Sequence, residues 1–289
     1  MRIVKKKKRR FKIDFKRLLN KKFLPLYIAA AAVIFVFVIV LGTGKTANVT
    51  REEDTAFYSR STIYVGIDAQ NNSFAFKDEN GGYSGYDVDV ITELLKRAYP
   101  EKKIVFREAD SQIASYKLKT GEINLAIGQY VRGVTKTQGL SLTQGYYTDD
   151  VYAYVSADSG ITEINSLRSK DVLVMTTQIP RTTVKNALKG INDGINIISC
   201  SSFADARDSL KNGTAGAIIA PEQMMVLRSE GYERLSDVIT TVDYRILAWQ
   251  TSTGVSSYLN VHLKNMQEDG TLAELQQKYG IYKEPQEKQ

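Results

Sequence analysis

The stretch GYDVDVITELLKRAYP, residues 85–100, decides the fold. It predicts a helix over residues 87–99, because its apolar side chains recur at a spacing that places them on one helical face. Pro100 ends this helix, since proline lacks the backbone donor and disfavours helical geometry in the residue before it. The apolar positions are Val88, Ile91, Leu94, Leu95 and Ala98.

Strands and helices are expected to alternate on both sides of this helix. A short hairpin precedes it, because residues 74–76 are followed by the turn residues Asn80, Gly81 and Gly82. The expected strands are 62–68, 103–107, 125–127, 172–175, 195–198 and 217–220. The expected helices run from the cap residue Ser111 to Gly121, follow Pro180 and Pro221, and cover 203–211, 254–270 and 271–280. Such alternation is typical of an α/β protein with helices on both faces of a sheet.

Two decapeptides 92 residues apart resemble each other. Residues 118–127 read LKTGEINLAI, and residues 210–219 read LKNGTAGAII. Each combines the end of a helix, a glycine and a strand that enters a core. The match fits two lobes of related build, although helix–glycine–strand units are common in α/β proteins and one match can arise by chance.

The motif that opens the stretch resembles the signature of the bacterial extracellular solute-binding proteins of family 3, the polar amino acid receptors of ABC importers. Leu95 departs from it, since a smaller residue usually stands there. Further segments resemble the family in order, and the resemblance covers about residues 60–282. They are the hairpin 74–81, the two decapeptides, the aromatic pair Tyr146 and Tyr147, and residues 268–280.

The resemblance implies two α/β lobes joined by two crossing strands, the periplasmic-binding-protein-like fold. Lobe one would comprise residues 60–149 and 247–282, and lobe two residues 155–241. The crossings would fall near residues 149–154 and 242–246, leaving 283–289 as a tail. The ligand would bind in the cleft between the lobes, which would close by a hinge motion.

An α-amino acid requires a cation and backbone N–H groups for its carboxylate, an acid for its ammonium group and apolar walls for its stem. The family holds the carboxylate with a threonine and an arginine. The corresponding segment, residues 128–136, places Tyr130 at the threonine and Thr135 or Lys136 at the arginine. Arg132 could supply the guanidinium from a shifted position, or could be a solvated loop cation.

Other lobe-one candidates follow from the same resemblance. Asp68, at the end of the first strand, matches a common family acid. Asn71 and Asp110 stand where the family has wall aromatics. Phe74 could be a stacking wall, although a place in the core is favoured.

In lobe two, the segment TTQIPR, residues 176–181, replaces the usual glycine- and threonine-containing anion loop. Thr177 and Gln178 are its candidate ligand contacts. Pro180 has no N–H and alters the anion cradle. Arg181, just inside a helix start, could replace it as an anion contact or could simply be exposed.

The family acid that binds the ligand's ammonium aligns with Pro221, and Glu222 follows it. Glu222 is therefore the candidate ammonium partner, although a glutamate in the first turn of a helix also has a plain helix-dipole explanation. Most positions that bind the amino acid in the family therefore carry a different residue type in this sequence.

The basic charge of the chain belongs to its first residues. The formal net charge is +7, but residues 1–22 hold 12 Lys/Arg against one acid, Asp14, which leaves 27 basic and 31 acidic residues in the remainder. Residues 23–44 carry no charge and are long enough to span a bilayer. We therefore expect residues 23–44 to be a retained single-pass transmembrane anchor, followed by a linker over residues 45–59. The tail, residues 1–22, would lie in the cytoplasm and bind anionic lipid rather than nucleic acid. The body would lie outside the cell.

Three functions remain open. The first is a membrane-tethered receptor that delivers an amino acid or another small polar solute to an ABC permease. The second is a sensory or regulatory ectodomain that acts through a protein partner. The third, an enzyme with Asp68 and Asp110 as acid and base, is disfavoured. One Cys and one His exclude a disulfide framework and a multi-His metal site, and we expect neither a cofactor nor a metal.

Overall fold

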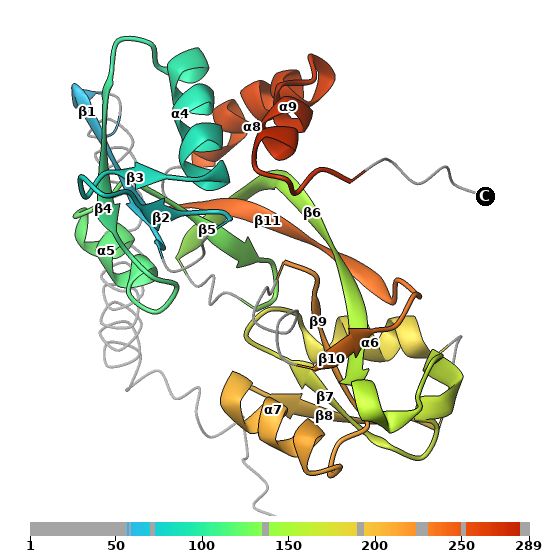
Figure 1. Ribbon diagram of the computed structural model, residues 1–289. Helices are drawn as coiled ribbons and strands as arrows, with labels where there is room; N and C mark the ends of the chain where they lie inside the picture. The colour runs from blue at the N-terminus through green and yellow to red at the C-terminus, as the bar shows by residue number, and fades with distance from the viewer. Residues whose placement is uncertain are drawn as a thin grey trace, which may run out of the picture. The chain divides into compact units, whose positions relative to one another are not determined.

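The computed structural model (Figure 1) describes residues 57, 59–69, 73–134, 139–189, 194–223, 231–249 and 253–283. All of them lie in the second of the two units into which the chain divides, Thr50–Gln289. The predicted tail and anchor lie outside the described residues, as do most of the linker, Asn71, and residues 224–230, where most of the helix expected after Pro221 would fall. No helix within the described ranges is both long and apolar enough to cross a membrane.

Two long antiparallel strands form the middle of the main sheet. β6 (Leu140–Ser156) and β11 (Thr240–Trp249) pair from Thr240 opposite Val151 to Trp249 opposite Leu140. The ladder shifts register around Tyr244 and Arg245, as expected for a bulge that bends a strand. The sequence predicted only short crossings here, whereas β6 is 17 residues long.

Two sets of parallel strands flank this pair, and the sheet order is β4-β1-β5-β11-β6-β9-β7-β8, with β10 (Tyr232–Arg234) paired to β6. The first set is β4 (Lys103–Glu108), β1 (Thr62–Ile67) and β5 (Leu125–Val131). The second set is β8 (Asn196–Cys200), β7 (Asp171–Met175) and β9 (Ala217–Pro221). A separate hairpin joins β2 (Phe76–Lys77) to β3 (Tyr83–Ser84).

The helices follow the predicted order. α4 (Tyr86–Ala98) packs against α8 (Thr253–Glu268) and α9 (Thr271–Lys278) beside the first set of strands. α6 (Arg181–Leu188) and α7 (Phe203–Lys211) pack on the second set. Short 3₁₀ turns occupy Ala157–Ser159 and Ile164–Leu167.

α4 buries the predicted apolar face, and Gly85 sets where it begins. Gly85 has φ 127°, and a Cβ at this position would lie 2.3 Å from the carbonyl oxygen of Phe74. Only glycine allows the chain to pass so close to the hairpin. The motif that begins at Gly85 therefore reflects a steric requirement for glycine as well as the apolar pattern of the helix.

The start of α5 (Ala114–Thr120) corrects one prediction. Ser111 does not cap this helix. Asp110 Oδ1 instead accepts hydrogen bonds from the backbone N–H groups of Gln112, at 2.8 Å, and Ile113, at 3.0 Å. A carboxylate in this position binds the free donors ahead of the helix, and it sits one residue earlier than the serine.

The two similar decapeptides adopt the same local structure. Gly121 ends α5 with φ 74°, and Gly213 follows α7 with φ 70°. Each glycine N–H donates to the carbonyl of the leucine three residues earlier at 3.2 Å. Two residues beyond each glycine, the N–H groups of Ile123 and Ala215 donate to carbonyls six residues back. The helix-to-strand turns of the two sets therefore have the same build, as predicted.

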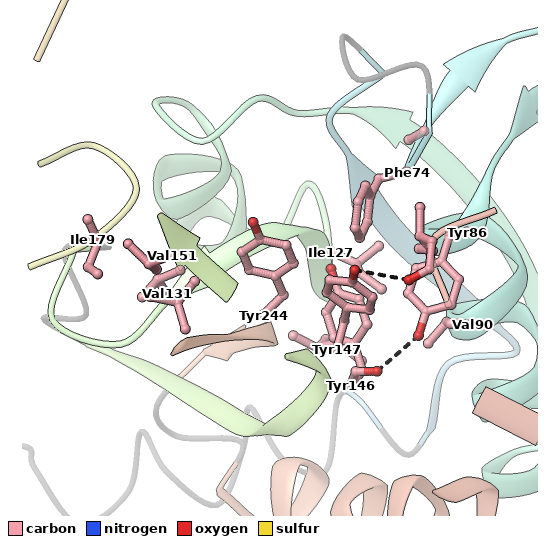
Figure 2. Close-up of a cluster of buried hydrophobic side chains, with 14 of the residues drawn as sticks. Phe74, Tyr86, Val90, Ile127, Val131, Tyr146, Tyr147, Val151, Ile179 and Tyr244 are labelled. Carbon is pink, nitrogen blue, oxygen red and sulfur yellow. Dashed lines mark hydrogen bonds between the residues drawn. The ribbon is translucent and has the colours of Figure 1, made fainter. Parts of the chain in front are cut away.

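Aromatic side chains fill the core where the first set of strands meets the middle pair (Figure 2). The Phe74 ring packs edgewise against Tyr86, Tyr147 and Tyr244, with centroids 5.3–5.6 Å apart. The Tyr86 hydroxyl donates to the carbonyl of Tyr146 at 3.0 Å. These contacts join the hairpin, α4 and both middle strands.

Candidate ligand-binding site

The first half of the candidate site is the edge where the parallel strands β4, β1 and β5 reach their carboxyl ends. Open α/β sheets bind ligands at this kind of edge. Asp68 follows β1 and is half-buried. It lies beside β5, because a Cβ on Gly128 would be 3.2 Å from Asp68 Cβ and 3.8 Å from Tyr130 Cε2. The structure thus brings two of the candidate site residues, Asp68 and Tyr130, to the same stretch of β5.

The second half is the loop that follows β7. Gln178 N–H donates to the carbonyl of Met175 at 2.9 Å, which turns the chain sharply after the strand. Thr177 is exposed on this turn and Gln178 is half-buried. A Cβ on Gly133 would lie 3.2 Å from Pro180 Cγ, so the loop after β5 touches the loop after β7. The carboxyl ends of the two sets therefore meet at this point.

Tyr130 is a buried residue of the first half. Its side chain is 2% exposed, and its hydroxyl has no hydrogen-bond partner in the described part of the chain. Burial raises the pKa of Tyr130 far above its usual range, and the charges of Asp68, Asp87 and Asp110 add to this rise. The phenol is therefore neutral and keeps its O–H as a hydrogen-bond donor.

Two predicted arginines differ in their surroundings. Arg132 is exposed, as expected of a solvated loop cation. Arg181 donates from Nε, at 3.1 Å, and Nη2, at 2.6 Å, to the carbonyl oxygen of Ile197. Its guanidinium thereby fastens α6 to β8. If Arg181 also bound an anionic group of the ligand, its guanidinium would share its N–H donors between that group and the Ile197 carbonyl. The anion-binding role of Arg181 stays a prediction.

Glu222 belongs to a group of charged residues at the crossing strands. Its Oε1 accepts from Arg234 Nη1 at 2.6 Å, and its Oε2 lies 2.9 Å from Lys283 Nζ. Lys283 also binds Asp149 at 3.1 Å and Asp150 at 3.0 Å. Two cations already compensate the carboxylate of Glu222, so the proposed contact with a ligand ammonium group would have to compete with them.

Phe74 and Asp110 have structural roles in this part of the fold. Phe74 is 1% exposed within the aromatic core, in agreement with the favoured interpretation over a stacking wall. Asp110 holds the turn before α5. Asn71 lies outside the described residues. Asp68, Tyr130, Thr177 and Gln178 are the predicted positions at the two facing edges.

Asp87 was not singled out as a site residue, although it stands in the motif that decides the fold. It is 1% exposed, and neither carboxylate oxygen makes a hydrogen bond of normal geometry within the described ranges. Burial raises the pKa of the Asp87 carboxyl to about 8; the Tyr146 hydroxyl works against this rise and the charge of Asp68 adds to it. The feature of the sequence that marks Asp87 as unusual is its position on the apolar side of an amphipathic helix.

No group of three or more His, Cys, Asp or Glu side chains in the described part of the chain could hold a metal ion. His262 packs edgewise on Tyr258, and Cys200 donates to the carbonyl of Ser202. The His262 contact lies on α8, away from the two facing edges. Cys200 ends β8, and its carbonyl oxygen accepts from the Thr176 N–H at 2.9 Å, so it lies beside the loop that follows β7.

Comparison with known proteins identifies the class. Residues 63–281 match the profile of the bacterial extracellular solute-binding proteins, family 3. The chain is 23% identical over 241 residues to the glutamine-binding protein of Geobacillus stearothermophilus, covering 76% of this chain and 91% of that protein. It is 28% identical over 238 residues to the histidine-binding periplasmic protein of Escherichia coli K12, covering 75% and 86%.

Solved structures share the fold. Tv2483 bound to L-arginine superposes with a TM-score of 0.60 at 18% identity, covering 80% of this chain and 93% of that one. A probable amino-acid ABC transporter extracellular-binding protein from Bacillus subtilis superposes with a TM-score of 0.61 at 21% identity, covering 76% and 97%. The predicted two-lobed periplasmic-binding-protein-like fold is confirmed.

This chain therefore belongs to family 3 of the bacterial extracellular solute-binding proteins.

Proposed function

We propose that this protein is a membrane-tethered extracytoplasmic receptor that binds an amino acid or a closely similar polar solute and delivers it to an ABC permease. The observation that carries the proposal is the facing of two carboxyl-end edges at Gly133 and Pro180, in a chain that matches the family over residues 63–281. A solute held between such edges draws both sets of strands together, which is the hinge closure expected of this fold.

The chemistry of the edges favours a ligand with hydrogen-bonding and cationic groups. Asp68 offers a carboxylate, and Tyr130 a neutral hydroxyl beside it. Thr177 and Gln178 offer polar side chains and backbone groups from the opposite loop. A protonated amine would bind Asp68 with a charge-assisted hydrogen bond, which is stronger than a neutral one.

The tether and the location belong to the same proposal. They rest on residues 1–44, where a basic tail precedes an uncharged stretch of 22 residues. The tail would remain in the cytoplasm against anionic lipid, and the binding unit would lie outside the membrane. Residues 45–59 would give it a reach of at most ~50 Å.

Calorimetry on the purified full-length protein tests the proposal. Glutamine, histidine and arginine are titrated separately, and each bound solute is then tested for compaction by small-angle scattering. We expect at least one to bind and to reduce the radius of gyration. The Asp68→Asn variant should weaken binding at least tenfold, the size of one lost charged hydrogen bond. The exposed Asp158→Asn variant is the matched control and should leave the affinity unchanged.

A sensory ectodomain is the alternative, and one observation favours it. Arg181 and Glu222, two of the groups expected to hold an amino acid's charged ends, are occupied by contacts within the chain. If no solute binds and the full-length protein is recovered from membranes with a partner other than a permease, the receptor proposal is wrong.

A further inference from the structure

Lys283, shortly after α9, lies among three carboxylates at the crossing strands. Its Nζ is 3.1 Å from Asp149 Oδ1, 3.0 Å from Asp150 Oδ2 and 2.9 Å from Glu222 Oε2. The Asp149 side chain is fully buried, and those of Asp150 and Glu222 are mostly buried. Charges withdrawn from water in this way attract each other more strongly than surface charges, because the solvent screens them less.

The three carboxylates belong to the part of the sheet that continues into the second set of strands. The ladder between β6 and β11 shifts register at Arg245, where the strands are expected to bend. Asp149 and Asp150 follow this shift on β6, directly before that strand begins to pair with β9. Glu222 follows β9, and its backbone N–H donates to the Asp150 carbonyl at 2.8 Å. All three carboxylates therefore lie beyond the bend.

Lys283 itself is held from the side of the first set. It follows α9, which packs against α4 and α8. Ile281 is buried, its N–H donates to the Gln276 carbonyl at 3.0 Å, and its own carbonyl accepts from the Tyr147 hydroxyl at 3.1 Å. Tyr147 in turn packs on Phe74 in the aromatic core (Figure 2). These contacts fix the chain just before Lys283 to the first set, so its ion pairs span the bend.

An open cavity of about 540 Å³ lies beside these ion pairs, between α9 and the strands beyond the bend. Its lining includes Thr148 and Thr241 from the strands, Leu272 and Gln276 from α9, and Lys283. The cavity leaves room for the strands to move relative to α9. The ion pairs of Lys283 resist such a movement, because they join the two sides of the cavity.

The two carboxyl-end edges are in contact in the arrangement that these ion pairs hold. The loops after β5 and β7 meet at Gly133 and Pro180. Ile179 of the second loop is fully buried and belongs to the same apolar cluster as Val131 and Val151 (Figure 2). A rotation of the second set about the bend would separate the edges and would also change the distances from Lys283 to its carboxylates. The ion pairs therefore favour the arrangement in which the edges meet.

We propose that Lys283 is a positioning residue of the receptor, which holds the two edges together across the strand bend and thereby raises the affinity for a ligand bound between them. The inference rests on the proposed function, since it concerns the hinge closure of the same site. Lys283 acts through the population of the closed arrangement, because the apparent affinity falls in proportion to the fraction of molecules that are competent to bind. It needs no contact with the ligand.

A distance measurement without ligand tests this role. Spin labels are attached to Lys119→Cys on α5 and Ala204→Cys on α7, two exposed positions on opposite sets, in the full-length protein carrying Cys200→Ser. Pulsed electron paramagnetic resonance then gives the distribution of distances between the labels. We expect Lys283→Met to shift the ratio of near to far molecules about three- to tenfold towards the longer distance, as for a partly buried charged contact. Lys283→Arg should restore the wild-type distribution.

The matched control is Lys264→Met, which removes an exposed ion pair within α8 and should leave the distribution unchanged. If Lys283→Met does not fold, a second variant combines Asp150→Asn with Glu222→Gln. This variant leaves the buried Asp149 paired with its cation, and it should shift the distribution in the same direction. Label distances that remain at the wild-type values in the folded variants overturn the proposal.

Calorimetry with glutamine, histidine and arginine separates the inference from the proposed function. For each solute that binds the wild type, Lys283→Met should weaken binding about three- to tenfold, and Lys283→Arg should restore it. An unchanged affinity in Lys283→Met overturns the inference and leaves the receptor function intact. Binding of none of these solutes to the wild type overturns the receptor function and with it the effect on affinity, and the label distances then decide whether Lys283 holds the edges together.

Discussion

Replacement of Phe74 by leucine separates a core role from a ligand-contact role. The Phe74 ring is 1% exposed and makes edgewise contacts with Tyr86, Tyr147 and Tyr244. Each such aromatic pair contributes ~0.5–1.5 kcal/mol beyond the area it buries. Because neighbouring contacts are not additive, we expect Phe74→Leu to lower the free energy of unfolding by about 2–3 kcal/mol. In a unit of this size, each kcal/mol lowers Tm by about 2–4 °C.

The assay is urea unfolding of the full-length protein followed by circular dichroism, together with calorimetry of the tightest-binding solute at a temperature where both proteins are folded. The free energy of unfolding should fall and Kd should remain within about threefold, which is under 0.7 kcal/mol. The opposite pattern, with unchanged stability and lost affinity, would show that Phe74 is a wall of the site and that its assignment to the core is mistaken.

Three further predictions concern charge and backbone. Lys283→Met removes the cation beside Asp149, whose side chain is fully buried, and should lower the free energy of unfolding in urea by about 1–3 kcal/mol. The control is Lys264→Met, which removes an exposed ion pair with Glu268 and should lower it by less than ~0.5 kcal/mol. Gly85→Ala should destabilise by more than Gly121→Ala, because both have positive φ but a Cβ meets the Phe74 carbonyl only at Gly85; equal costs in thermal unfolding would contradict the steric argument. For Asp87, the pKa of about 8 in the folded state lies above the unfolded value near 4, so the folded state binds more protons between these two pH values. The free energy of unfolding therefore falls as pH rises, by at most ~1.4 kcal/mol per pH unit. A free energy of unfolding that instead rises between pH 5 and pH 8, by an amount that Asp87→Asn removes, would contradict this assignment.

The sequence predicted the fold well where local chemistry decides the structure. The apolar period of residues 87–99 gave α4, and the two glycine-ended decapeptides gave matching turns at Gly121 and Gly213. It did not reveal the length of β6, because that strand passes from one set of strands to the other and its pattern changes along the way. The Ser111 cap failed because a better hydrogen-bond acceptor, Asp110, stands one residue earlier.

The site was predicted less completely, since its residues are defined by partners distant in sequence. Nothing near Glu222 indicates that Lys283, some 60 residues later, compensates its charge. Nothing near Arg181 indicates that the carbonyl of Ile197 takes its guanidinium. Asp87 was part of the family motif, yet only the packed structure shows that its carboxylate has no hydrogen bond of normal geometry to another described residue. Asp68 and Tyr130 were separate candidates from the family resemblance, and only the structure shows that both lie beside Gly128.

The most direct test of the account is a thermal-shift screen of the full-length protein against amino acids, short peptides, sugars, polyamines and cell-wall fragments. A solute present at 100 times its Kd stabilises the folded state by ~2.7 kcal/mol, which raises Tm by about 5–10 °C in a unit of this size. The account predicts such a rise for at least one amino acid, and a loss of that rise in Asp68→Asn. A well-folded protein whose Tm responds to none of these solutes would contradict it.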